Sequence, residues 1–279
     1  MNCVVDTVRY REDIVSLWHE CFGDEKEYIG FFLDNCTDKL CLGYIGEEGL
    51  TSMLFLLNGS VNGCSCKYIY AACTSKRFRG RGLMGGLIEY SKQFCLDKKI
   101  DFIFLVPGEE SLYSYYSRFG FIPKMMRTDI ELKGGNGTFK PHKTTDIRFA
   151  AEKRLKLLPA DRFAFDLKTT EYTVREFLHT GGEIYFADGE NGYLAFAVRD
   201  NKNILIKELL TQFNKNLTNI LTLFENLDAE NVYIRTPLVY NSKDIGSVCT
   251  KCGMLYPISG KAKDCINATD IFYSGMYLD

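Results

Sequence analysis

The first 133 residues alternate between helix-like and strand-like patterns of apolar positions. Ile14, Leu17 and Cys21 recur at helical spacing, and a second amphipathic helix begins at Asp24. We therefore expect two helices early in the chain. Segments rich in β-branched, aromatic and large apolar residues then follow at 39–45, 51–57 and 66–73. Turn-forming residues separate these segments, which predicts an antiparallel meander.

The apolar period changes after the meander. Leu83, Leu87 and Phe94 mark a helix that ends near residue 96, and the segment 101–106, apolar from Phe102 onward, predicts a buried strand. A strand, a helix and a second strand in this order predict a crossover with the two strands parallel. A short helix around 109–117 and strand segments at 119–122 and 127–132 complete this half.

A glycine-rich segment divides the chain. Three of the four residues 134–137 are glycine, which disfavours both helix and strand. We therefore place a linker at 134–145, between a domain of residues 1–133 and a domain of residues 146–279. The second half repeats the order of the first, with strands at 182–187, 192–199 and 203–209, a helix at 216–227 and a strand at 231–236. This order predicts a second copy of the same topology.

The composition is that of a globular protein, with 46% hydrophobic residues, 25% charged residues and six prolines. A net charge of -2 gives no general attraction to nucleic acid or to an anionic membrane. The N-terminus lacks the pattern of a signal peptide, so we expect a cytoplasmic protein whose eleven cysteines are reduced. The pairs Cys64/Cys66 and Cys249/Cys252 are half of a zinc motif each, and we expect no metal site.

The clearest chemical signal is a basic, glycine-rich loop at 75–86, between a predicted strand and a helix. It carries no acid and four cations, Lys76, Arg77, Arg79 and Arg81. A glycine-rich loop that leads into a helix is suited to bind an anion, although a solvated helix-capping turn has the same composition. The Walker motif is excluded, because Leu255 stands where it requires a glycine before Gly260-Lys261. A dinucleotide fingerprint fits poorly after an antiparallel meander.

The loop and a later segment resemble the GNAT superfamily of N-acetyltransferases. The phosphate loop of that family, Gln/Arg-x-x-Gly-x-Gly/Ala, matches literally at Arg77–Gly82, while its usual aromatic-Arg-Gly-x-Gly context favours Arg79–Met84. The segment 112–121 resembles the family's Tyr-x-x-x-Gly-Phe signature. A large residue at Met84, a strand that ends Leu-Val-Pro107 and a second, degenerate half are similar to the enhanced-intracellular-survival type.

The resemblance implies an α/β (α+β) fold of the GNAT type with a mixed, mostly antiparallel sheet, followed by a second GNAT-like domain without a phosphate loop. The sterol-carrier-like third domain of the enhanced-intracellular-survival type is expected to be missing. Acetyl-CoA is the implied co-substrate, and its pantetheine arm is expected along the backbone of Ala72, Cys73 and Thr74. Its pyrophosphate is expected on the backbone N–H groups of Arg79, Gly80, Arg81, Gly82, Leu83 and Met84.

The resemblance also implies a general acid. Tyr116 matches the family's position, although Tyr113 and Tyr115 lie close enough to take its place, and the three tyrosines could instead pack a core. A phenol stays protonated at neutral pH and can donate to a leaving thiolate. Cys73 is expected to contribute its backbone and not a nucleophile. The general base stays open among water and four acids, Glu25, Glu27, Glu109 and Glu110.

The resulting prediction is an N-acetyltransferase that acts by direct attack of an amine in a ternary complex. The acceptor is a primary amine of a small molecule or peptide, and the acidic loop 23–27 suits a cation, although a solvated helix start explains that loop equally. The alternatives are a CoA-binding sensor or interaction protein without turnover, and a tandem-GNAT aminoacyl transferase that uses charged tRNA. In relatives the terminal carboxylate enters the active site, whereas for Asp279 we favour an exposed strand end.

Overall fold

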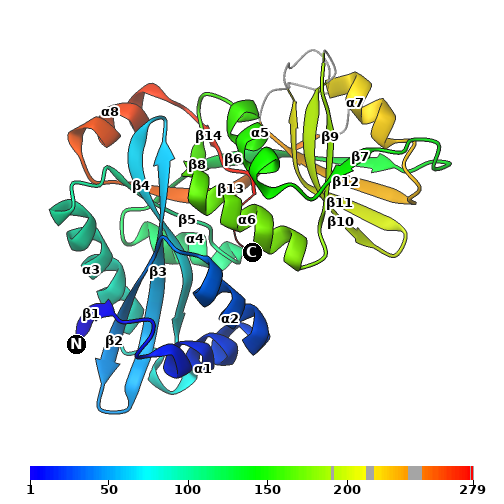
Figure 1. Ribbon diagram of the computed structural model, residues 1–279. Helices are drawn as coiled ribbons and strands as arrows, with labels where there is room; N and C mark the ends of the chain where they lie inside the picture. Colours follow the sequence, from blue (N-terminus) through cyan, green and yellow to red (C-terminus); the bar gives the residue numbers. More distant parts are fainter. Residues whose placement is uncertain (190–191, 212–216, 238–246, 277, 279) are drawn as a thin grey trace. The chain divides into compact units, whose positions relative to one another are not determined.

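The computed structural model describes residues 1–189, 192–211, 217–237, 247–276 and 278 (Figure 1). It divides into two compact units. Unit 1 consists of Met1–Lys124 and Gly253–Asp270, and unit 2 consists of Met125–Cys252 and Ile271–Asp279. The chain therefore leaves unit 1 within strand β6 (Ile122–Lys133) and returns to it within strand β13 (Val248–Pro257).

Unit 1 is built on a mixed sheet with the strand order β1-β2-β3-β4-β5-β13. Its first five strands are β1 (Asn2–Val5), β2 (Lys39–Gly46), β3 (Gly49–Val61), β4 (Cys64–Thr74) and β5 (Phe102–Leu105). Neighbours from β1 to β4 are antiparallel, and β5 is parallel to β4. The predicted meander and crossover are confirmed. Residues Met254–Pro257 of β13 lie antiparallel to β5 at its other edge.

Helices cover both faces of this sheet. They are α1 (Arg11–Phe22), α2 (Lys26–Asn35), α3 (Leu83–Asp97), α4 (Glu110–Ser117) and α8 (Gly260–Ala268). Leu87 and Ile88 of α3 pack on one face, in a cluster with Ile69 and other strand residues. On the other face Trp18 of α1 and Phe32 of α2 pack around Phe55, with ring centroids 5.0–5.7 Å apart. Burial of these large apolar side chains holds the layers together.

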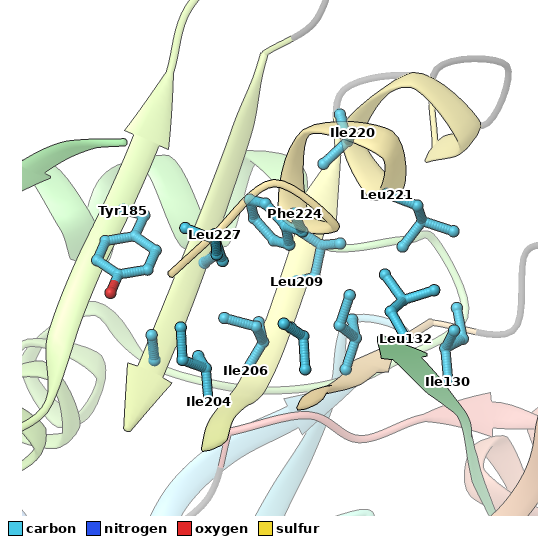
Figure 2. Packing of buried hydrophobic residues seen from close by; sticks show 14 of the residues in the cluster. Ile130, Leu132, Tyr185, Ile204, Ile206, Leu209, Ile220, Leu221, Phe224 and Leu227 are labelled. Carbon is cyan, nitrogen blue, oxygen red and sulfur yellow. The ribbon is translucent and has the colours of Figure 1, made fainter. Parts of the chain in front are cut away.

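Unit 2 has a second mixed sheet, ordered β6-β12-β11-β10-β9-β7, with β14 parallel to β6. Its other elements are β7 (His142–Thr144), α5 (Ile147–Leu157), β8 (Phe163–Phe165), α6 (Leu167–His179), β9 (Glu183–Ala187), β10 (Tyr193–Asp200), β11 (Asn203–Thr211), α7 (Leu217–Phe224), β12 (Asn231–Thr236) and β14 (Phe272–Tyr273). Figure 2 shows Ile220, Leu221 and Phe224 of α7 above Leu209 and Leu132 of the sheet. Helices α5 and α6 cover Leu194 and Phe196 on the other face.

The predicted internal repeat is present. Strands β9, β10 and β11 are antiparallel neighbours, and β12 follows α7 and runs parallel to β11. This is the order of β2, β3, β4, α3 and β5 in unit 1. The sheet of unit 2 is completed by β6, which follows α4 in the chain and lies antiparallel to β12.

The boundaries between the two units do not lie at the predicted linker. The segment 134–145 belongs to unit 2, where Gly134 N donates to Glu230 O and His142–Thr144 pairs with β9. A Cβ on Gly134 would lie 2.0 Å from Ala229 O, so this glycine allows a close backbone approach and does not mark a flexible connection. The two strand segments predicted at 119–122 and 127–132 are replaced by the single strand β6, most of which belongs to unit 2.

A buried ion pair holds the C-terminal segment within unit 2. Arg154 Nε donates to Glu208 Oε2 at 2.6 Å, and the two side chains are 2% and 0% exposed. Glu208 Oε1 also accepts from Tyr273 Oη at 2.9 Å and from Met276 N at 3.1 Å. Leu278 is buried, and Asp279, whose carboxylate was considered above, lies outside the described residues. Among the residues described, no helix has the length and apolar character needed to cross a bilayer.

Candidate functional site

A pocket of ≈ 570 Å³ opens in unit 1 where strands β4 and β5 part. The pairing of these strands ends at Ile69 and Leu105, whereas β4 continues to Thr74. The last residues of β4, after Ile69, therefore extend beyond the end of its pairing with β5. The pocket is lined by α1, the end of β4, the loop before α3, and α4, through Cys21, Phe22, Ala72, Cys73, Thr74, Phe78, Arg79, Gly80, Gly82, Leu83, Met84, Gly85, Leu112, Tyr115, Tyr116 and Arg118.

A β-bulge lies where β4 begins to line the pocket. Met53 faces Cys73 and Phe55 faces Tyr70, so Leu54 stands opposite two residues, Ala71 and Ala72. Ala71 has φ +47°, a left-handed conformation that costs an alanine roughly 1–2 kcal/mol. A bulge bends its strand and re-aims the side chains that follow. It therefore determines how the last residues of β4 face the pocket.

The N-terminus of α3 forms a second wall. Gly82 is the N-cap residue, and no side chain caps the helix there. The first N–H groups of a helix have no partner within it and carry the positive end of the helix dipole. Gly80 and Gly82 both have φ +76°, and a Cβ on either would meet nothing within 4 Å. Glycine is therefore favoured by the backbone conformation and not by lack of space.

The structure gathers most of the residues that the sequence singled out. The residues Ala72, Cys73, Thr74, Arg79, Gly80, Gly82, Leu83, Met84 and Tyr116 all line the pocket. Arg81 does not, and its guanidinium packs 5.0 Å from the centre of the Phe78 ring. Arg77 pairs with Glu48 at 3.0 Å and is also absent from the lining, so the lining follows the register Arg79–Met84 more closely than Arg77–Gly82.

Two of the three candidate tyrosines reach the pocket. Tyr116 is 8% exposed, and its ring packs edge-on against Tyr115, with centroids 5.2 Å apart. Burial raises the pKa of Tyr116 to about 12, so the phenol is protonated at neutral pH. Tyr115 also lines the pocket, beneath the guanidinium of Arg118 at 5.0 Å. Tyr113 packs against the core cluster of unit 1 and is not a lining residue.

A thiol pair at the pocket was not singled out by the sequence. Cys21 Sγ donates to Thr74 O at 3.4 Å, beside Cys73, and both cysteines line the pocket. The contact with Cys73 lowers the pKa of Cys21 to about 7, with a further contribution from Arg79, against the opposing effects of burial and Glu20. The same contact, together with burial, raises the pKa of Cys73. In the sequence, Cys21 was only an apolar position on a predicted helix.

The candidate bases lie elsewhere. Glu25, Glu27, Glu109 and Glu110 are not among the described residues that line the pocket. The acidic loop 23–27 is fixed by Trp18 Nε1, which donates to Asp24 Oδ2 at 2.6 Å. In the described part of the chain no cluster of three or more His, Cys, Asp or Glu side chains is arranged to hold a metal ion.

Comparison with known proteins gives the family of unit 1. A family model described as an acetyltransferase (GNAT) domain matches residues 7–123. This region is a GNAT domain. The match includes the end of β4, the loop before α3, and α4, so it contains every lining residue of the pocket. No curated protein matches the chain by sequence.

Solved structures extend the likeness to the whole chain. Eis1 from Mycobacterium abscessus superimposes with a TM-score of 0.69 at 9% identity, covering 94% of this chain and 75% of that one. A GCN5-related N-acetyltransferase from Kribbella flavida gives 0.66 at 14% identity, with 94% and 72% covered. A conserved protein of unknown function from Enterococcus faecalis V583 gives 0.71 at 12% identity, with 94% and 73% covered. The chain thus has an α/β GNAT fold similar to that of Eis1, and its residues 7–123 match the acetyltransferase (GNAT) domain.

Proposed function

We propose that the protein is an N-acetyltransferase that transfers acetyl from acetyl-CoA to a primary amine of a small molecule or peptide by direct attack. One observation carries the proposal. A single pocket combines an extended strand edge, an uncapped helix N-terminus and a protonated, buried tyrosine. An extended pantetheine arm, a pyrophosphate and a leaving thiolate need these three features in this order.

The residues of the pocket fit acetyl-CoA in chemical terms. Peptide-like groups of a pantetheine can pair with the backbone of Ala72, Cys73 and Thr74, which continues beyond the end of β5. The N–H groups at the start of α3 and the Arg79 guanidinium supply positive potential for a pyrophosphate. When bound, acetyl-CoA supplies an activated acyl group as a thioester.

Tyr116 is proposed to protonate the leaving sulfur. Because burial raises the pKa of Tyr116 to about 12, its phenol keeps its proton at neutral and mildly alkaline pH, where a fraction of an amine is neutral. Phe121 packs against the same ring, with centroids 5.9 Å apart, and limits its motion. The attacking amine must lose its own proton, and none of the four acids considered as bases lines the pocket, which favours water as the base.

The test combines turnover with binding. Release of CoA thiol is followed over a panel of polyamines, aminoglycosides and peptide amines, and CoA binding is measured by calorimetry. Tyr116→Phe is expected to lower kcat roughly 10²-fold while CoA affinity changes less than twofold. Tyr115→Phe and Tyr113→Phe are the matched controls. A larger loss of kcat in either of them would show that this tyrosine, and not Tyr116, is the general acid. CoA binding without thiol release for any amine would indicate a sensor and contradict the enzyme.

A further inference from the structure

Cys21 and Cys73 lie next to each other in the wall of the pocket, on two different elements. Cys21 is at the end of α1 and half-buried, and Cys73 is near the end of β4 and 5% exposed. Cys21 Sγ donates at 3.4 Å to the carbonyl of Thr74, the residue that follows Cys73, and both cysteines line the pocket. Such a pair can join α1 to β4 if the two sulfurs are oxidised.

The surroundings of Cys21 favour its reaction with an oxidant. Arg79 Nε donates to Thr74 O at 3.1 Å, the same carbonyl to which Cys21 donates, so a guanidinium stands beside the thiol. Glu20 is partly engaged elsewhere, since its Oε1 accepts from Ser75 Oγ and Lys76 N. A thiol beside a cation, in a pocket that small molecules can enter, is the usual setting of a reactive cysteine.

We propose that Cys21 and Cys73 are a modification site at which a hydroperoxide forms a reversible disulfide that closes the pocket to its ligand. The Cys21 thiolate attacks one oxygen of hydrogen peroxide, forming Cys21–SOH and hydroxide. The Cys73 sulfur then attacks the sulfur of Cys21–SOH, forms the S–S bond and releases water. Two thiols are oxidised and one peroxide is reduced. A dithiol reductant reverses the reaction.

The disulfide changes the pocket at its lining. The crosslink removes the hydrogen bond from Cys21 to Thr74 O and draws α1 and β4 together at the strand edge that the proposed function assigns to pantetheine. The inhibitory consequence therefore rests on the proposed function, whereas the crosslink does not. Cys41 and Cys95 of unit 1 are poor competitors, since burial raises the pKa of each thiol to about 12. Cys249 is exposed and serves as the comparison thiol.

The experiment treats the full chain with hydrogen peroxide, blocks remaining thiols with iodoacetamide under denaturing conditions and maps tryptic peptides. Trypsin releases Cys21 within residues 12–26 and Cys73 within residues 68–76, with one cysteine in each. We expect these two peptides to appear joined, and to separate after dithiothreitol. In the same samples CoA affinity is expected to fall at least tenfold and to return on reduction.

Variants distinguish oxidation of Cys21 and Cys73 from oxidation of other cysteines. Cys21→Ser and Cys73→Ala each remove the joined peptides, and peroxide should then leave the CoA affinity of each at its own starting value. Cys249→Ser should respond as the unmodified chain does. Oxidation of Cys21 only to sulfinic acid, reaction of Cys249 before Cys21, or unchanged CoA affinity in the crosslinked protein would overturn the proposal. Failure of the reduced protein to bind CoA would instead contradict the proposed function, and the peptide map would still decide on the disulfide.

Discussion

The loop before α3 gives the sharpest test of anion binding. Gly80 and Gly82 stand at positive φ with open space around their missing Cβ atoms, so side chains can be introduced there without a clash. We expect the double change Gly80→Asp/Gly82→Asp to abolish most CoA binding. The Asn pair at the same positions is the matched control, because Asn and Asp tolerate left-handed backbone about equally and differ in charge.

The size of the effect follows from Coulomb's law. At a separation taken as about 6 Å, a carboxylate and a phosphate, each of unit charge, repel in water by roughly 0.7 kcal/mol. Two carboxylates facing two phosphate charges give about 2.8 kcal/mol, or roughly a 100-fold loss of affinity. The Asn pair should lose less than tenfold. Both variants should melt at similar temperatures, since both carry the same backbone strain.

The assay is calorimetric titration with CoA at two salt concentrations. Because screening shortens the reach of exposed charges, the difference between the Asp and Asn variants should shrink as salt rises from about 0.05 to 0.5 M. Equal losses of CoA affinity in the Asp and Asn variants would show that the added charge does not cause the loss. Unchanged affinity of the Asp variant, with wild-type melting, would remove the anion site from this loop altogether.

Two further predictions concern buried and reactive groups. Glu208→Ala leaves Arg154 charged and buried, so we expect the free energy of unfolding, measured with urea, to fall by about 3–5 kcal/mol. The double variant Arg154→Met/Glu208→Leu should recover most of that loss. An unchanged urea midpoint for Glu208→Ala would contradict a stabilising role of the pair. The rate of alkylation of Cys21 should fall as the pH drops through about 7. In Cys73→Ala the pH midpoint of alkylation should move upward, because the contact with Cys73 that stabilises the thiolate is gone. An unchanged pH midpoint would show that Cys73 does not lower the pKa of Cys21.

The features that the sequence predicted well are local in the chain. The meander of β2, β3 and β4 depends on turns between neighbours, and the loop before α3 carries its own signal in four cations and its glycines. Helices α5 and α6 were missed, although Asp146 and Asp166 are N-caps whose side chains accept from Phe149 N and Thr169 N at 2.9 and 2.8 Å. Those capping residues were a usable signal.

What could not be predicted depends on distant partners. The alternation of apolar residues in β6 shows that the strand has two different faces, but it does not say that its neighbour is β12 and not β5. Cys21 became part of the site only because α1 packs against the end of β4, a contact between residues separated by 53 positions. Neither the spacing nor the composition of α1 encodes that contact.

Strand β13 is translated long after the first segment of unit 1, and this order affects folding on the ribosome. Residues 253–270 complete unit 1 with β13 beside β5 and with α8, where Lys124 Nζ donates to Ile266 O at 2.8 Å. They are translated roughly 130 residues after Lys124, about 6–26 s later at 5–20 residues per second. During that interval the edge of β5 is unpaired, and a fragment cut at residue 133 would keep it so permanently. We therefore expect the GNAT domain to fold fully only when the distal segment is present, in the same chain or in a circular permutant.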